Sequence, residues 1–208
     1  MLKEYLKKNY GYNEPIFISE IQLAEISDNA LRQYFKRMLK SGDLARFDTG
    51  IYYLPKASRL LQKSYLDPMK VIIRKYIQNK AGTYGYFSGA TFANQIGLTS
   101  QMSATLEIVT SKESTKGRIV TIGSQTIRLK RPAIDITAEN AGLLQFLDAV
   151  SQAEKYSELS DAETGALLKD YAKQKNYCRD LLTNVLPAVT GSTAKKLIEW
   201  GIIYEFTS

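Results

Sequence analysis

Residues 27–40 (Ser-Asp-Asn-Ala-Leu-Arg-Gln-Tyr-Phe-Lys-Arg-Met-Leu-Lys) are the segment that most constrains how this chain folds. At 3.6 residues per turn, the apolar side chains fall on one side of a helix and can join a core: Leu31, Phe35, Met38 and Leu39. A second stripe is polar and basic: Asn29, Gln33, Lys36 and Lys40, with Arg32 and Arg37 beside them. Asp28 is the only acid of the segment and lies in the first turn, where the helix dipole favours it. The segment therefore predicts a helix with one buried face and one basic face.

Short elements on both sides of this helix complete a small domain. Residues 2–10 predict a first helix, and residues 19–26 predict a second one that opens with a capping-box pattern. Two β-prone runs follow the basic helix, at 43–47 and 51–54, and the turn chemistry of 48–50 joins them as a hairpin. Three helices and a hairpin within about 55 residues are the order of a winged helix-turn-helix.

In a winged helix-turn-helix the third helix is expected to enter the major groove, with the hairpin as the wing. Amide and guanidinium groups hydrogen-bond base edges, and basic side chains neutralise phosphates. The predicted DNA-binding residues are Asn29, Arg32, Gln33, Lys36, Arg37, Lys40, Arg46 and Thr49. Gln33 or Asn29 would read adenine, and Arg32 would read guanine. The alternative is that this helix face is only a solvated surface, and Asp48 at the wing tip would repel phosphate.

The remainder of the chain predicts a second domain. Asp67 and Ser88 are predicted to cap two helices, and three strands follow, at 104–110, 117–122 and 125–130. These strands predict a small antiparallel sheet, after which the chain becomes helical. We therefore expect an α+β protein with an N-terminal winged helix-turn-helix and a C-terminal mixed domain. The expected divisions are 1–58 for the DNA-binding domain, 59–132 for the sheet-containing part of the second domain and 133–208 for its helical part.

The basic residues are concentrated in the front and the middle of the chain, which has a formal net charge of +7. The net charge is +3 in residues 1–60, +8 in residues 61–131 and −4 in residues 132–208. Such a balance favours a polyanionic partner. A group of basic residues on or near the predicted sheet is a candidate surface for flanking phosphates, or for a nucleotide or RNA: Arg74, Lys75, Lys112, Lys116, Arg118, Arg128 and Lys130.

The chain contains no histidine and one cysteine, Cys178. These counts exclude a Ser-His-Asp triad, a Cys-His pair, an internal disulfide and the histidine- or cysteine-based zinc sites of hydrolases and deaminases. No phosphate-binding glycine motif is present, so we expect no catalytic residue, no metal and no cofactor. A nucleic-acid enzyme that uses lysine and carboxylates alone is the enzymatic alternative. No run approaches the ~20 apolar residues of a membrane span, and a cytoplasmic protein without a membrane partner is expected.

Several longer sequence segments are similar to those of a known protein family. They are Ser-Asp-Asn-Ala-Leu-Arg-Gln-Tyr-Phe-Lys-Arg-Met from Ser27, Gly50-Ile-Tyr-Tyr-Leu-Pro, Gly85-Tyr-Phe-Ser-Gly-Ala and Ile96-Gly-Leu-Thr-Ser-Gln-Met-Ser-Ala-Thr-Leu-Glu-Ile-Val-Thr. With them the chain resembles the AbiEi-type antitoxins of bacterial abortive-infection toxin-antitoxin systems, which give phage resistance. The resemblance covers most of the chain and is firmest in residues 27–55 and 84–110.

The resemblance implies a two-domain repressor and antitoxin. Its winged helix would bind inverted repeats in its own promoter, and its C-terminal domain would oppose a nucleotidyltransferase toxin without a stable complex, as in type IV systems. The recognition-helix positions carry over to the DNA-binding role, whereas no residue can be assigned to antitoxicity. The alternative function is a transcription regulator whose C-terminal domain binds a small ligand or dimerises. A neighbouring nucleotidyltransferase gene would favour the antitoxin.

Overall fold

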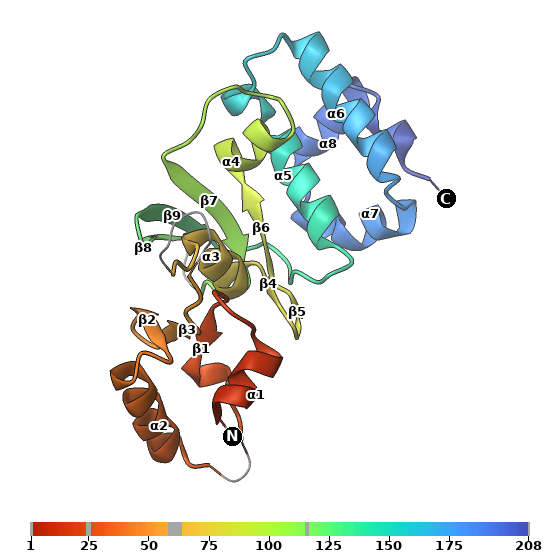
Figure 1. The fold of residues 1–208 in the computed structure, drawn as a ribbon. Helices are drawn as coiled ribbons and strands as arrows, with labels where there is room; N and C mark the ends of the chain where they lie inside the picture. The colour runs from red at the N-terminus through yellow and green to blue at the C-terminus, as the bar shows by residue number, and fades with distance from the viewer. Residues whose placement is uncertain (1, 24–25, 58–63, 115–116, 208) are drawn as a thin grey trace. The chain divides into compact units, whose positions relative to one another are not determined.

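The computed structural model describes residues 2–23, 26–57, 64–114 and 117–207. These residues form a mixed α+β fold with eight α-helices and several small sheets, as Figure 1 shows. The chain divides into two compact units, Met1–Arg74 and Lys75–Ser208. This division falls within helix α3 (Pro68–Tyr76), whereas the predicted domain boundary, between residues 58 and 59, lies outside the described residues.

The N-terminal unit combines helices with a three-stranded sheet. In chain order it contains α1 (Leu2–Asn9), β1 (Ile16–Phe17), the 3₁₀ helix η1 (Ile18–Glu20), α2 (Asp28–Lys40), β2 (Ala45–Asp48), β3 (Ile51–Tyr53) and most of α3. The strand order is β1-β3-β2, and both pairings are antiparallel. The hairpin of β2 and β3 was predicted, and β1 adds a third strand to it that was not predicted.

The second helix that the sequence predicts over residues 19–26 is wrong for the described residues. Only the short η1 occupies the start of that range. The backbone N–H of Ile18 donates to the carbonyl of Gly50, 3.0 Å away, so the segment that leaves β1 is tied to the hairpin turn. One helical turn then remains before Ile21, whose N–H donates to the carbonyl of Ile18.

The core of the N-terminal unit holds α2 in place through its apolar face. Leu31 and Phe35 are buried with Leu6 of α1 and Ile16 of β1. The Phe35 ring packs edge-on against the ring of Tyr52, with centroids 4.9 Å apart. This packing fixes which side of α2 faces the solvent.

The C-terminal unit has a four-stranded sheet covered by helices. That sheet contains β6 (Gly85–Ser88), β7 (Thr105–Thr110), β8 (Arg118–Ile122) and β9 (Gln125–Lys130), and a separate two-stranded sheet contains β4 (Gln78–Asn79) and β5 (Gly82–Thr83). The helices of this unit are α4 (Gly89–Gln95), α5 (Ala141–Tyr156), α6 (Asp161–Lys175), α7 (Arg179–Val185), α8 (Gly191–Glu199) and the 3₁₀ helices η2 (Leu186–Ala188) and η3 (Ile202–Glu205).

The order of the four-stranded sheet is β6-β7-β9-β8, and β7 pairs with β9 in parallel. The sheet is therefore mixed, and the predicted antiparallel sheet is a wrong expectation. The hairpin of β8 and β9 was predicted correctly, but it joins the sheet through its second strand, so β9 runs beside β7 in the same direction. The side chains of β9 alternate between a buried and an exposed face, because Ile127 and Leu129 are fully buried while Arg128 is exposed.

Local sequence signals explain how the C-terminal helices begin and pack. Ser160 and Glu163 form a capping box at the start of α6. Gly165 lies one turn later, where a Cβ atom would come within 2.7 Å of the Trp200 side chain. Glycine therefore allows Trp200 to lie directly on the α6 backbone, which closes one side of the helical core.

Candidate nucleic-acid interface

Helix α2 begins and ends where its sequence predicts. Ser27 is the N-cap, and its hydroxyl accepts a hydrogen bond from the backbone N–H of Ala30 at 3.3 Å. Asp28 lies in the first turn, and Arg37 and Lys40 lie in the last turn, so each charge complements the helix dipole. Gly42, with a φ of +74°, follows the C-terminus in the left-handed conformation that glycine adopts without strain.

All six predicted DNA-binding residues of α2 are exposed: Asn29, Arg32, Gln33, Lys36, Arg37 and Lys40. None of the four basic side chains among them forms a salt bridge within the part of the chain that the structure describes. The Arg37 guanidinium lies 5.0 Å from the centroid of the Tyr34 ring, which is itself 41% exposed. These cations are therefore available to an external anion.

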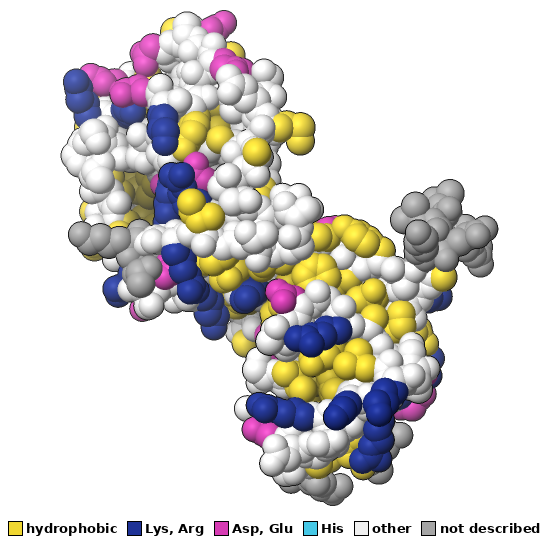
Figure 2. Space-filling view, turned by 90° about the vertical axis from the view of Figure 1, so that its left-hand side faces the viewer, with side chains coloured by type: hydrophobic (Ala, Val, Ile, Leu, Met, Phe, Trp, Pro, Cys, Tyr) yellow, Lys and Arg dark blue, Asp and Glu magenta, His cyan; other side chains and the backbone are white. Residues whose placement is uncertain are grey.

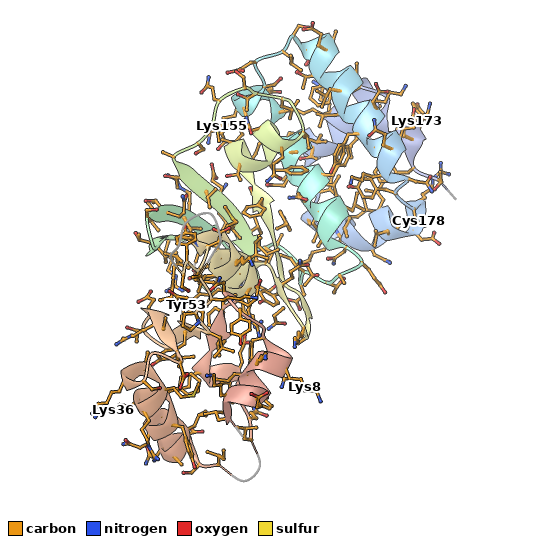
Figure 3. All side chains as sticks on the ribbon, in the orientation of Figure 1. Lys8, Lys36, Tyr53, Lys155, Lys173 and Cys178 are labelled. Atoms are coloured by element: carbon orange, nitrogen blue, oxygen red, sulfur yellow. The ribbon has the colours of Figure 1, made fainter. Side chains whose placement is uncertain are left out.

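Lys and Arg side chains are prominent on the face of the N-terminal unit that Figure 2 shows. Figure 3 shows Lys36 projecting from α2 on the side of the unit opposite to Lys8, which projects from α1. In the space-filling view, Lys and Arg side chains lie around a patch of hydrophobic side chains on the lower, N-terminal part of the molecule (Figure 2). An apolar patch ringed by cations can contact both the sugar edges and the phosphates of a nucleic acid.

The Arg46 side chain extends from strand β2 to the turn of the hairpin. The Arg46 guanidinium donates to the backbone carbonyl of Asp48 at 3.3 Å and to the hydroxyl of Thr49 at 3.0 Å. The Asp48 carboxylate accepts a hydrogen bond from the backbone N–H of Thr49 at 2.6 Å, which holds this acid at the turn. Arg46 and Thr49, the two predicted wing residues, are exposed and directly bonded to each other. The carboxylate that opposes phosphate binding is exposed at the same tip.

The basic surface predicted for the second domain is distributed differently. Arg74 belongs to the N-terminal unit, where it forms a 2.7 Å salt bridge with Glu20 and lies over the Tyr10 ring. Arg118 pairs at 2.7 Å with Glu113, a buried carboxylate. Lys116 lies outside the described residues.

The other four members of that surface also differ in their surroundings. Lys130 pairs at 2.6 Å with Glu107, whereas Lys112 and Lys75 lie over the rings of Tyr84 and Tyr76. Arg128 is exposed on β9. Several of these cations thus have carboxylate partners within the protein, in contrast to the cations of α2.

A largely buried polar cluster joins the four-stranded sheet to helix α5. No sequence pattern indicated this cluster. Glu107 of β7 accepts hydrogen bonds from the Lys130 ammonium and from the Tyr156 hydroxyl, at 2.6 and 2.7 Å. Burial alone would raise the pKa of Glu107, but the ammonium and the hydroxyl lower it below its usual range. Glu107 is thus held as a carboxylate within the fold.

The second part of this cluster corrects the role predicted for Ser88. Ser88 stands at the N-cap position of α4, but its hydroxyl makes no capping hydrogen bond and donates instead to Asp148 Oδ2, 2.5 Å away. Burial raises the pKa of Asp148, while the Ser88 hydroxyl and the Lys130 ammonium act in the opposite direction. No sequence signal connects two residues that lie on separate elements at this distance along the chain.

Two negative findings apply to the described residues alone. They contain no group of three or more Cys, Asp or Glu residues arranged to hold a metal ion. None of their helices combines the length and the apolar character needed to cross a membrane.

The chain matches no protein-family model and no curated protein.

Proposed function

We propose that this protein is a DNA-binding transcriptional autorepressor and antitoxin. Its N-terminal unit would be a winged helix-turn-helix that binds inverted repeats in its own promoter. Its C-terminal unit would counter a nucleotidyltransferase toxin. The observation that carries the DNA-binding part is the row of exposed basic side chains on α2, which have no carboxylate partner among the described residues.

The arrangement of the N-terminal unit supports the winged helix. The hairpin of β2 and β3 follows α2 directly, and β1 pairs with β3 to give a sheet in the order β1-β3-β2. In this reading η1 takes the place of the second helix, α2 is the recognition helix and the Arg46 turn is the wing. A short first element of the helix-turn-helix leaves the recognition helix packed on the core through Phe35.

The dimensions and chemistry of α2 suit the major groove. Its 13 residues span about 20 Å, and its exposed side chains change character along its length. Asn29, Arg32 and Gln33, which can hydrogen-bond base edges, occupy the first half. Lys36 and Lys40, which suit phosphates, occupy the second half. Base reading by the first half, with register fixed by the second, follows from this order.

A gel-shift experiment on the promoter duplex at ~150 mM salt tests the groove assignment. The double variant Gln33→Ala with Arg37→Ala is expected to lose promoter binding, since it removes one base-reading side chain and one cation. The matched control is Lys173→Ala with Gln174→Ala, which changes the same kinds of side chain on the exposed surface of α6. Unchanged promoter binding by the α2 variant would show that the groove assignment is wrong.

The antitoxin part of the proposal rests on the resemblance and on no geometry. Co-expression of the whole protein with the toxin encoded beside it is expected to restore growth. The Gln33→Ala with Arg37→Ala variant should restore growth equally well while losing repression of a promoter reporter. Failure of the wild-type protein to protect would refute the antitoxin function and leave the DNA-binding part standing.

A second candidate function is a regulator whose C-terminal unit binds a small ligand. The observation that favours it is a cavity of ≈ 240 Å³ in that unit. The gene beside this one separates the two functions, because a nucleotidyltransferase reading frame is required for the antitoxin and has no place in the regulator.

A further inference from the structure

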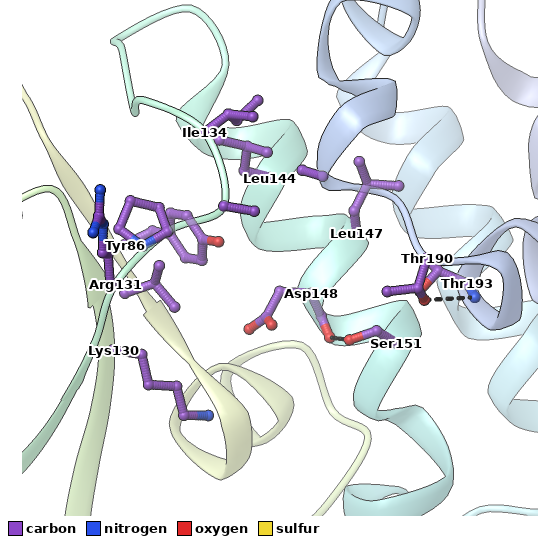
Figure 4. Close-up of a pocket in the computed structure, with 14 residues that line it drawn as sticks. Tyr86, Lys130, Arg131, Ile134, Leu144, Leu147, Asp148, Ser151, Thr190 and Thr193 are labelled. Atoms are coloured by element: carbon purple, nitrogen blue, oxygen red, sulfur yellow. Dashed lines mark hydrogen bonds between the residues drawn. The ribbon is translucent and has the colours of Figure 1, made fainter. Parts of the chain in front are cut away.

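The cavity of the C-terminal unit lies between the strands and helix α5 (Figure 4). Its apolar lining includes Val109 of β7, Ile134 of the segment after β9, and Leu144 and Leu147 of α5. At ≈ 240 Å³ it is smaller than the 300–1,000 Å³ of sites for drug-sized molecules, so its size suits a small molecule.

Tyr86 supplies a hydrogen-bonding group that is open to the cavity and has no protein partner among the described residues. The residue as a whole is 8% exposed, and its hydroxyl makes no hydrogen bond to any residue that the structure describes. Figure 4 shows this hydroxyl pointing from the strands toward α5, into the cavity. Burial raises the pKa of the Tyr86 phenol, and the nearby Asp148 carboxyl adds to the effect, so the group stays a neutral donor. A hydroxyl that is open to a cavity and has no protein partner can donate to a bound molecule, which makes it a candidate ligand contact.

The charges around the cavity favour an anion at one end. Lys130 is already paired with Glu107, and one oxygen of Asp148 accepts the Ser88 hydroxyl. Arg131 is exposed at the cavity and forms no salt bridge within the described ranges. In Figure 4, Arg131 lies on the strand side and Asp148 on the helix side, so an anion at Arg131 is separated from this carboxyl. A guanidinium offers paired N–H donors to a carboxylate or a phosphate.

We propose that this cavity binds a small organic anion, either a carboxylate or a phosphate ester. The ligand would also have an apolar part that fills the cavity. The anionic group pairs with Arg131, the ring or chain contacts Leu144 and Leu147, and a polar atom accepts a hydrogen bond from the Tyr86 hydroxyl. The inference does not depend on the proposed function, because it concerns the C-terminal unit without DNA or toxin.

Binding is tested on the full chain with four probes by NMR of labelled leucine methyl groups. Benzoate and phenyl phosphate carry both an apolar ring and an anion, benzyl alcohol carries only the ring, and inorganic phosphate carries only the anion. We expect benzoate, phenyl phosphate or both to shift the methyl resonances of Leu144 and Leu147. The preferred probe distinguishes carboxylate from phosphate as the anion. Benzyl alcohol and inorganic phosphate should bind at least about fivefold more weakly.

Three variants complete the test, with Trp200 fluorescence as the check that each one folds. Arg131→Gln should weaken binding of the preferred probe about threefold to tenfold, a range that allows for its exposure. Tyr86→Phe, which keeps the apolar ring, should weaken it about fivefold. The matched control Lys173→Gln, an exposed cation on α6 away from the cavity lining, should leave it unchanged. The proposal is overturned if neither anion binds up to ~10 mM, if benzyl alcohol binds equally well, or if Arg131→Gln has no effect.

Discussion

Replacing Lys130 by methionine is expected to destabilise the C-terminal unit strongly, although lysine residues usually matter little for stability. The Lys130 ammonium lies 2.6 Å from the Glu107 carboxylate. The whole Glu107 residue is 8% exposed, and its carboxylate has one further described hydrogen-bond donor, the Tyr156 hydroxyl. Methionine keeps most of the aliphatic stem, so the variant removes mainly the charge.

The magnitude follows from the unequal burial of the two partners. Removing one member of a fully buried ion pair costs about 3–5 kcal/mol, because the other charge is left uncompensated. The Lys130 side chain is 33% exposed, against 11% for Glu107, so water replaces part of the lost interaction. We therefore expect the free energy of unfolding to fall by about 2–3 kcal/mol at pH 7.

The effect should depend on pH in a defined direction. In the wild-type protein the pKa of Glu107 is lowered, so its contribution to stability is present above the ordinary glutamate pKa and is lost as the pH falls through the lowered value. In Lys130→Met, burial dominates and the folded-state pKa of Glu107 rises, so protonation relieves the buried charge. The difference in stability between the two proteins should therefore be largest near pH 7 and should narrow toward about pH 4.

Urea unfolding followed by tryptophan fluorescence measures this difference. The single tryptophan of the chain, Trp200, lies in the C-terminal unit and reports on that unit. Glu107→Gln is the companion variant, because it removes the charge at the buried end and should cost less than Lys130→Met. A loss below about 0.5 kcal/mol in Lys130→Met, or a loss that grows as the pH falls, would refute the reasoning.

Three further predictions concern stability and helix boundaries. Phe35→Ala should destabilise the N-terminal unit by about 3–5 kcal/mol, since the ring is 1% exposed, and thermal unfolding by circular dichroism would measure it. Ser160→Ala should cost about 1 kcal/mol in urea unfolding by removing the capping box with Glu163, and a loss above 2 kcal/mol would indicate another role. Gly89→Ala should lower the free energy of unfolding of the C-terminal unit by more than about 1 kcal/mol, measured by urea unfolding. The reason is that φ of Gly89 is +57° and the new Cβ would lie 2.6 Å from the Glu107 carboxylate. An unchanged free energy of unfolding would contradict this explanation.

Features that depend on neighbours along the chain were predictable from the sequence. Ser27 caps α2 and Ser160 caps α6, because a capping hydroxyl needs only the backbone N–H three residues later. The burial of Leu31 and Phe35 follows from the 3.6-residue period of the segment. The exposed basic face of α2 follows from the same period, since it lies opposite the buried one.

Features that depend on distant pairing were not predictable. Ser88 has the same capping chemistry as Ser160, but Asp148 competes for its hydroxyl from a helix that lies far along the chain. The alternation of β9 gives its buried face correctly, yet alternation does not distinguish a parallel neighbour from an antiparallel one. The cations Arg74 and Lys130 belong to a basic stretch of sequence, and only the fold reveals their partners Glu20 and Glu107.

The salt dependence of promoter binding tests the central claim most directly. Fluorescence anisotropy with a labelled promoter duplex gives the slope of the logarithm of the binding constant against the logarithm of salt concentration. Lys36→Gln should reduce the magnitude of this slope by about 0.9 for each chain bound, because one phosphate contact is lost. Lys8→Gln changes the net charge equally on the opposite side of the same unit and should leave the slope unchanged. Equal slopes for wild type and Lys36→Gln would contradict the assignment of α2 as the DNA-binding helix.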